Sequence, residues 1–270
     1  MSRVVRRRLL PVAAAGCAAA LLVGCKPATV TVAFRPRAGA EYRYDVRVHS
    51  TTITRLGASE PEVSVDDAVL RSDGTVLSAG PGDVRVRVQL HRQGSPDRTF
   101  VVRLDRAAQL AGVETVEGLP PSVLGPDALP EILPGAPAAP PDRPLAPGDR
   151  WDIDLRPDLP GADQTRLQGS GRLVELRLVN GRKVASTSAV TRIPLTSSEP
   201  VRRGILTLDG VATTESTALR ALNDGAVEEA TTITRGRFDV TLAPPPGSPG
   251  DPLTGTLAID VRSETRRLPT

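Results

Sequence analysis

The chain has 270 residues, of which 39% are apolar, 24% charged and only 2% aromatic. This composition allows a globular protein and excludes a polytopic membrane protein, a coiled coil and a simple disordered tail. The formal net charge of +3 comes from the first residues, where four arginines and no acid precede residue 25. Without residues 1–24 the 34 basic residues become 30 against 31 acidic ones, and a net charge of −1 offers no basic excess to nucleic acid.

The N-terminus has the layout of an export signal. Its four arginines precede an uncharged run over residues 9–23, which is too short for a comfortable transmembrane helix. The sequence Leu22-Val23-Gly24-Cys25 then resembles the lipobox of bacterial lipoproteins. This resemblance implies cleavage after Gly24, a diacylglyceryl group on the thiol of Cys25, and attachment to the membrane through acyl chains.

The same resemblance implies an extracytoplasmic protein, anchored to the cell membrane or, in a Gram-negative host, to the outer membrane. Arg6-Arg7-Arg8-Leu9-Leu10 leaves general secretion and twin-arginine export both open. Cys17, the other cysteine, would leave with the signal peptide, so no thiol remains for a disulfide or a zinc site. We therefore expect a signal peptide over residues 1–24 and a lipidated N-terminus and tether over residues 25–35.

Beyond the tether the dominant hydrophobic period is two, which is typical of strands with one buried face. Two further stretches, residues 205–220 and 227–242, are rich in Thr and Val and indicate additional strands. The alternating apolar sets are Tyr42, Tyr44, Val46 and Val48; Val84, Val86, Val88 and Leu90; Val174, Leu176 and Leu178; and Leu257, Ile259 and Val261.

Turn-forming residues separate these runs, because Asn-Gly and Asp-Gly readily adopt the positive φ angles of tight hairpins. Asn180-Gly181 is the strongest of these turn signals, and it predicts a hairpin between residues 173–179 and 183–193. Short helices are expected only over residues 106–110 and 121–133. The predicted turns are Ser72-Asp73-Gly74, Pro81-Gly82-Asp83, Asn180-Gly181, Asp209-Gly210 and Asn223-Asp224-Gly225.

A Pro-rich connector over residues 120–147 divides a first β-unit, 36–119, from a second one, 148–270, which we expect to pack with the first. Gly39 and Gly148 are each followed three residues later by an aromatic residue, Tyr42 and Trp151. Either a duplicated β-unit or chance similarity between two amphipathic strands explains this match. We expect a mainly β protein, an antiparallel meander with one or two short helices, curled into a half-barrel or arranged as a sandwich.

Residues that could carry catalysis, a metal or a cofactor are not grouped in the sequence. His49 and His91 fall in the polar phase of their strands and would be neighbours only if those strands pair. Gly169-Ser170-Gly171 lacks the strand-to-helix turn of a nucleophile elbow, so its glycines indicate a bulge or a close backbone approach. The doublets Asp66-Asp67 and Glu228-Glu229 should point to opposite faces of a strand, so neither gives two converging carboxylates.

With no grouped catalytic or metal-binding residues in the sequence, the apolar face of the sheet is the remaining candidate surface for a ligand or a partner. A curled sheet is similar in plan to the LolA-, LprG- and LppX-type lipid carriers of bacterial envelopes, without a shared residue motif. The repeated Gly-x-x-aromatic strand also resembles an uncharacterised family of β-rich envelope lipoproteins. We expect a non-enzymatic envelope lipoprotein that binds a hydrophobic ligand or a protein partner. The alternatives are a structural or scaffold lipoprotein without a small-molecule ligand, and an extracytoplasmic hydrolase.

Overall fold

The computed structural model describes residues 29–81, 83–105, 110–117, 139–156, 166–201, 204–245, 247 and 249–269. These residues form eleven strands and no helix, and hence no helix long and apolar enough to cross a membrane. The strands are β1 (Glu41–Leu56), β2 (Glu62–Gly80), β3 (Asp83–Arg92), β4 (Arg98–Leu104), β5 (Leu110–Glu117), β6 (Arg150–Leu155), β7 (Leu167–Val179), β8 (Arg182–Val201), β9 (Gly204–Ala221), β10 (Val227–Ala243) and β11 (Leu253–Arg267).

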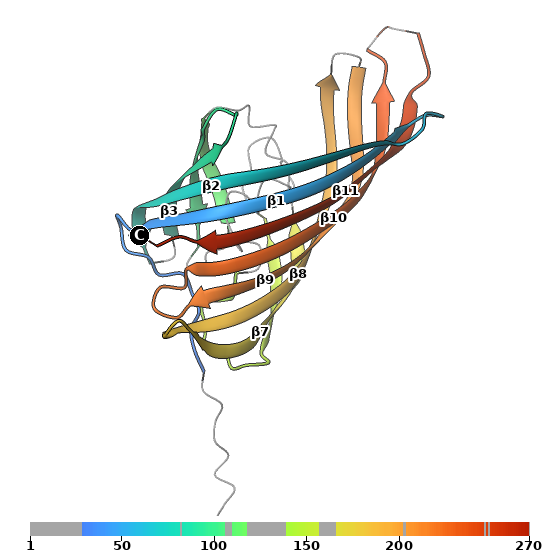
Figure 1. The fold of residues 1–270 in the computed structure, drawn as a ribbon. Helices are drawn as coiled ribbons and strands as arrows, with labels where there is room; N and C mark the ends of the chain where they lie inside the picture. The colour runs from blue at the N-terminus through green and yellow to red at the C-terminus, as the bar shows by residue number, and fades with distance from the viewer. Residues whose placement is uncertain are drawn as a thin grey trace, which may run out of the picture.

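All eleven strands form one antiparallel sheet in the order β5-β4-β3-β2-β1-β11-β10-β9-β8-β7-β6, which curls until it is nearly closed into a barrel (Figure 1). The first and last strands pair in the middle, with Tyr44 opposite Arg267 and Leu56 opposite Gly255. The prediction of a mainly antiparallel, curled β protein is therefore confirmed. The sandwich alternative is wrong, because the strands of both β-units hydrogen-bond into a single sheet.

Several predicted features lie outside the described residues. The lipobox Leu22-Val23-Gly24-Cys25 is one of them, as are residues 120–138 of the Pro-rich connector and the helix expected over 121–133. The other helix was expected over residues 106–110. Residues 106–109 also lie outside the described residues, and Leu110 is the first residue of β5.

Three of the five predicted turns are confirmed. Asn180 and Gly181 have φ angles of 50° and 75° and join β7 to β8. Asn223-Asp224-Gly225 joins β9 to β10, and Pro81 and Asp83 stand where β2 ends and β3 begins, with Gly82 outside the described residues. Each of these hairpins links neighbouring strands of the sheet.

The other two predicted turns, Ser72-Asp73-Gly74 and Asp209-Gly210, are wrong, because they lie inside β2 and β9. Their glycines serve the inner face of the sheet. Gly74 lies opposite Tyr42, and Gly210 lies opposite Phe238, whose ring a Cβ on residue 210 would overlap. At Gly210 a Cβ would also meet the backbone of Arg237, whereas at Gly74 it would find only ordinary contacts, and at both positions the backbone stays extended.

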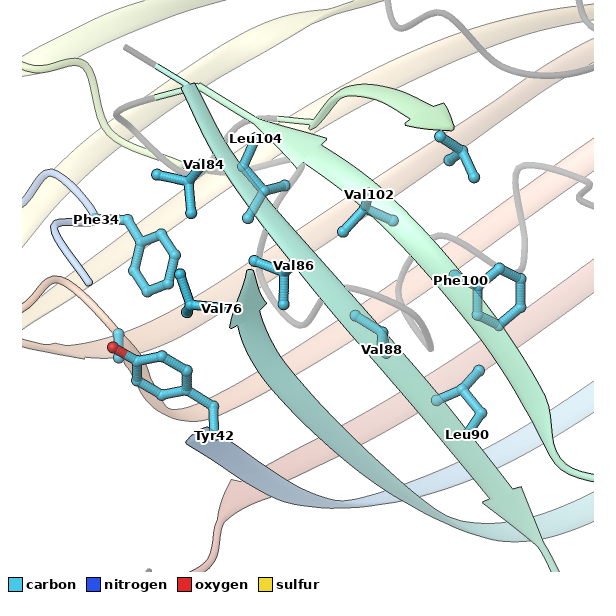
Figure 2. Packing of buried hydrophobic residues seen from close by; sticks show 12 residues of the cluster. Phe34, Tyr42, Val76, Val84, Val86, Val88, Leu90, Phe100, Val102 and Leu104 are labelled. Atoms are coloured by element: carbon cyan, nitrogen blue, oxygen red, sulfur yellow. The ribbon is translucent and has the colours of Figure 1, made fainter. Parts of the chain in front are cut away.

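The two largest apolar clusters lie on opposite sides of the barrel interior. The first, drawn in Figure 2, combines side chains of β1–β5 with Phe34, which lies beside Tyr42 with its ring centroid 5.6 Å from that of the tyrosine. The second combines Val32 and Leu145 with side chains of β6–β8: Trp151, Ile153, Leu173, Ala185 and Ala189.

Residues before β1 link these two clusters across one end of the barrel. Val30 pairs with Leu145, Val32 is fully buried in the second cluster, and Phe34 is buried in the first. The backbone N–H of Arg35 donates to the carbonyl of Asp224 in the β9–β10 turn, 2.7 Å away. The expectation of a tether as far as residue 35 is therefore wrong, because this segment is core from Val32 onward. We call this the proximal end and the opposite one the distal end.

The repeated Gly-x-x-aromatic segments have the same local structure. Gly39 and Gly148 both have positive φ angles, 80° and 97°. The N–H of Gly39 donates to Val76 and that of Gly148 to Leu173, and each acceptor residue donates in turn to the residue after the glycine. In both units a register shift follows that acceptor residue, between Val76 and Ser78 and between Leu173 and Glu175. This equivalence supports a duplicated β-unit.

The register shift after Leu173 also changes which side chains of β7 are buried. Leu167 and Leu173 are buried, whereas Val174 is 43% and Leu178 68% exposed. Of the predicted set Val174, Leu176 and Leu178, only Leu176 packs against the second cluster, because the bulge at Val174 moves the inner phase of β7 from odd to even residues.

Candidate ligand-binding face

Strands of unequal length leave part of the sheet without an opposite wall. β1 has 16 residues and β8 has 20, whereas β4 has seven and β6 has six. At about 3.3 Å per residue, β1 spans about 50 Å and β6 about 20 Å. The last pairs with the short side are Gln168 with Arg192 and Leu70 with Arg92. Beyond them β1, β2 and β8–β11 continue as a six-stranded distal extension, whose tips project in Figure 1.

On the inner side of the distal extension, β8–β11 and the end of β1 carry aliphatic side chains, whereas the inner phase of β2 consists of Glu62, Ser64 and Asp66. Cross-strand pairing sets Leu206 beside Leu242 and Leu242 beside Leu253, and places Val240 between Leu208 and Gly255. We call this surface the distal leucine face. Its half-buried or exposed members are Leu56, Leu195, Val201, Leu206, Leu208, Leu242, Leu253 and Leu257, of which Val201 is 40% and Leu253 52% exposed.

The outer side of the same strands is mostly polar, as the period of two requires. β9 shows the contrast within one strand, since Leu206 and Leu208 face inward while Thr207 and Asp209 face outward. The apolar residues on the outer side include Val211 on β9 and a small patch on the β1–β2 hairpin, where Ile53 lies opposite Val63, and Val65 follows on the same face. The side chains of Ile53, Val63 and Val65 are 42%, 58% and 58% exposed.

Below the distal leucine face, toward the proximal end, the inner surface of β8–β11 is made of small side chains. Three successive cross-strand rows consist of Thr, Ser, Ala and one Val, and they carry no charge. Thr214 and Thr234 share a hydrogen bond of 2.9 Å, and the hydroxyl of Thr187 donates to the carbonyl of Ala218 at 3.3 Å. The rows are Thr191, Thr214, Thr234 and Val261; Ala189, Ser216, Thr232 and Ser263; and Thr187, Ala218, Ala230 and Thr265.

Aromatic rings lie flat on glycines at the borders of these rows. Phe238 lies on the side where the leucine face begins, and a Cβ on either Gly210 or Gly236 would overlap it. Trp151 covers Gly171, its partner across the β6–β7 pair. Residue 169 has no room for a Cβ because the backbone of Val190 lies against it, so the close approach predicted at Gly169-Ser170-Gly171 is confirmed.

Charged residues collect at the proximal end. Arg267 lies 2.9 Å from Glu228 and 4.0 Å from Asp224, and its guanidinium stands over the ring of Tyr42, 4.9 Å from the centroid. The hydroxyl of Tyr42 donates to Asp224 at 3.3 Å. Burial raises the pKa of Tyr42, and the Asp224 carboxylate raises it further, while Arg267 acts in the opposite direction.

Arg220 lies deeper at the same end, on the inner side of β9, and is only 1% exposed. Its Nη1 donates to the carbonyl of Gly225 at 3.4 Å. Burial lowers the pKa of Arg220 to about 10, against the favourable influence of Tyr44. The pKa of Tyr44 is in turn raised by burial, with Arg267 opposing the rise. These contacts join the β9–β10 turn to β1 and stabilise the proximal end.

The two histidines are not neighbours, because β2 lies between β1 and β3. Nδ1 of His49 lies 2.7 Å from Asp67 on the exposed outer surface. His91 has a carboxylate at each ring nitrogen, Asp73 at 3.3 Å and Asp97 at 3.0 Å. Among the described residues no group of three or more His, Cys, Asp or Glu side chains could hold a metal ion.

The acidic doublets separate as their strands require. Asp66 pairs with Arg92 at 2.7 Å, whereas Asp67 contacts His49 on the opposite face. Glu228 joins the cluster around Arg267, and Glu229 is exposed. The prediction that neither doublet brings two carboxylates together is confirmed.

A shallow hollow of about 1360 Å³ lies on the outer surface at the proximal end. Its wall mixes acids and bases in cross-strand contact, such as Arg266 between Asp45 and Glu229, and Glu264 opposite Arg47. Opposite charges side by side offset each other, so the hollow offers no field of one sign to a charged ligand.

A comparison with known proteins finds no protein-family model that matches the chain and no characterised protein of similar sequence. The site therefore has to be defined by geometry alone. Sequence reasoning pointed to an apolar sheet face without assigning residues to it. The available signal was the run of inward leucines in β8–β11, but only the strand pairing showed that they form one surface.

Proposed function

We propose that the protein is a lipid-anchored, extracytoplasmic lipoprotein that binds a hydrophobic ligand without catalysis. Support for ligand binding comes from one observation above all, the partly exposed distal leucine face on the inner side of a curled sheet. Apolar surface gathered on one concave side is the common feature of sites for hydrocarbon ligands. The outer side of the same strands is mostly polar, which restricts an apolar ligand to the inside.

Attachment through Cys25 would fix the orientation of this face. Four residues separate Cys25 from Val30, the first residue paired with the body, so at about 3.3 Å per residue the proximal end stays within about 17 Å of the acylated cysteine. The distal extension would then point away from the membrane that holds the protein, and present its leucine face to a donor or an acceptor of the ligand.

The anchor is tested by growing cells with a radiolabelled fatty acid. The wild-type protein should carry the label and sediment with membranes, and the Cys25→Ser variant should do neither. An unlabelled protein whose mass includes residues 1–24 would contradict the anchor.

Ligand binding is tested on the mature chain carrying Cys25→Ser, purified without detergent and examined by native mass spectrometry and solvent extraction. We expect co-purified lipid that is released on denaturation. Leu206→Asp places a charge on the leucine face and should abolish binding, whereas Val211→Asp on the outer side of the same strand, 47% exposed in the wild type, should leave it unchanged. Equal loss in both variants, or no lipid with either natural or added acyl compounds, would contradict the proposal.

A protein partner is the second candidate, favoured by the apolar patch of Ile53, Val63 and Val65 on the outer side of the β1–β2 hairpin. Site-specific crosslinking from residue 65 should then capture the same envelope protein reproducibly, and Val63→Asp should prevent the capture. A folded Val63→Asp protein with an unchanged crosslinking pattern would leave ligand binding as the function.

A further inference from the structure

Two polar atoms are buried in the barrel just below the distal leucine face. Thr191 on β8 is 2% exposed and Trp151 on β6 is 6% exposed. In the part of the chain that the structure describes, neither the hydroxyl of Thr191 nor the indole N–H of Trp151 has a hydrogen-bond partner. Buried polar groups in native proteins are nearly always satisfied, so two such atoms on one wall point to a partner that comes from outside the chain.

The neighbours of Thr191 explain why its hydroxyl has no hydrogen-bond partner among the described residues. Its cross-strand neighbour Thr214 is engaged with Thr234 at 2.9 Å. Thr187, on the same strand and the same face, has a partner in the carbonyl of Ala218. The side chain of Thr191 differs from that of Thr187 only in this respect, and both are almost fully buried.

The two residues belong to adjacent cross-strand rows of the inner surface. Trp151 is opposite Gly171, which is opposite Ala189, and the next row contains Ile153, Gly169 and Thr191. The indole lies over Gly171 and belongs to the same apolar cluster as Ala189. Thr191 is four residues from Leu195 of the leucine face, about 13 Å along the strand.

The chemistry of these atoms defines what they could bind. An indole N–H only donates, and a threonine hydroxyl can donate, so both are served by an acceptor oxygen with two lone pairs. The inner rows of β7–β11 at this level contain no charged side chain. A carboxylate buried here would have no countercharge and would be strongly disfavoured, whereas a neutral carbonyl would not.

We propose that Thr191, with Trp151 as second donor, binds the carbonyl of an acyl linkage in a lipid whose hydrocarbon lies on the distal leucine face. This inference rests on the proposed function and adds to it the ligand class, an acyl ester or amide in place of a free fatty acid or a plain hydrocarbon. Thr191 is thus a specificity-determining residue at the base of the apolar surface.

The test compares two probes of equal chain length on the mature chain carrying Cys25→Ser: 1-palmitoylglycerol, an ester, and 1-O-hexadecylglycerol, an ether that lacks the carbonyl. Dissociation constants are measured by displacement of a fluorescent acyl probe. Thr191→Val removes the hydroxyl at constant volume, and Thr187→Val is the matched control on the same face. Thermal unfolding of each ligand-free variant shows whether it is folded.

We expect the wild type to prefer the ester by about five- to tenfold, the range of one hydrogen bond. Thr191→Val should lose most of the preference for the ester, with the affinity for the ether unchanged, and Thr187→Val should keep the preference. Trp151→Phe should reduce the preference in part. Ligand-free Thr191→Val should be no less stable than the wild type, because it loses no hydrogen bond.

Equal affinity of the wild type for ester and ether would overturn the carbonyl site while leaving the hydrophobic carrier intact. An undiminished preference in Thr191→Val would also overturn it. Binding of neither probe, nor of palmitate, would overturn both this inference and the proposed function.

Discussion

The indole of Trp151 lies across Gly171, its direct partner in the β6–β7 pair, and occupies the space in which a Cβ of residue 171 would stand. The same arrangement of glycine opposite aromatic occurs at the start of the first β-unit, where Tyr42 faces Gly74. The two units differ in detail, since a Cβ on Gly74 would find its nearest neighbour at 3.5 Å, in ordinary contact. This difference makes the pair of glycines a sensitive test of the packing.

Gly171→Ala should lower the free energy of unfolding by about 1–3 kcal/mol, the usual cost of overpacking, because the new methyl group meets the ring. Gly74→Ala is the control and should change it by less than about 0.5 kcal/mol, as expected where a methyl group fits without clashes. Urea denaturation measures both. Trp151→Ala alone should cost about 3–5 kcal/mol, and in that background Gly171→Ala should become nearly neutral. An unchanged cost there would show that the ring is not what excludes the methyl group.

Gly39→Ala and Gly148→Ala should each cost about 1–2 kcal/mol, because both glycines have left-handed φ angles. Space is not the reason, since nothing lies within 4 Å of a Cβ at either position. Asn at the same positions should cost less than Ala, because Asn tolerates this conformation better. Thermal or chemical denaturation of the four variants checks this, and a cost at only one of the two sites would contradict the equivalence of the repeated turns.

Phe34→Ala should destabilise the protein by about 3–5 kcal/mol, although the residue precedes the first strand, because its ring is buried against Tyr42. Arg35→Ala, with its side chain about half exposed, is the matched neighbour and should have little effect. Denaturation monitored by circular dichroism gives both values. Equal, small effects would mean that residues 29–36 are a tether after all.

Stability should fall as the pH rises above about 10, the ordinary tyrosine pKa. Burial raises the pKa values of Tyr42 and Tyr44, so the folded protein keeps these protons after the unfolded chain has released them. Their contribution is fully present below pH 10 and is lost as the pH rises toward the folded pKa values. Arg220, whose pKa is lowered, acts in the opposite direction over part of this range.

Urea denaturation at pH 8, 10 and 11 measures this loss, and absorbance at 295 nm follows tyrosine ionisation. Tyr44→Phe should lose less stability than the wild type between pH 8 and 11, whatever its stability at pH 8. A parallel decline in the variant and the wild type would contradict a contribution from Tyr44.

The alternation of apolar and polar residues was sufficient to predict most strands and their inner faces. Tyr42, Val46 and Val48 on β1, and Val84, Val86, Val88 and Leu90 on β3, are buried as the period of two requires. Turn-forming residues predicted the turn correctly where they join two strands in a tight hairpin, as at Asn180-Gly181. The turn prediction failed at Gly74 and Gly210, which lie inside long strands opposite aromatic residues of the neighbouring strand, and the alternation failed at Leu173, where a bulge changes the phase.

The sequence by itself determined which side of each strand is apolar, because side-chain alternation is a property of a single extended segment. Only the tertiary structure decided that β1 pairs with β11 and that six strands extend beyond the others. It also decided that inward leucines from the four hairpin-linked strands β8–β11 form one surface on the distal side of Thr191. Pairing between distant segments depends on closing the whole sheet, and no local pattern in the chain records how far each strand extends past its neighbours.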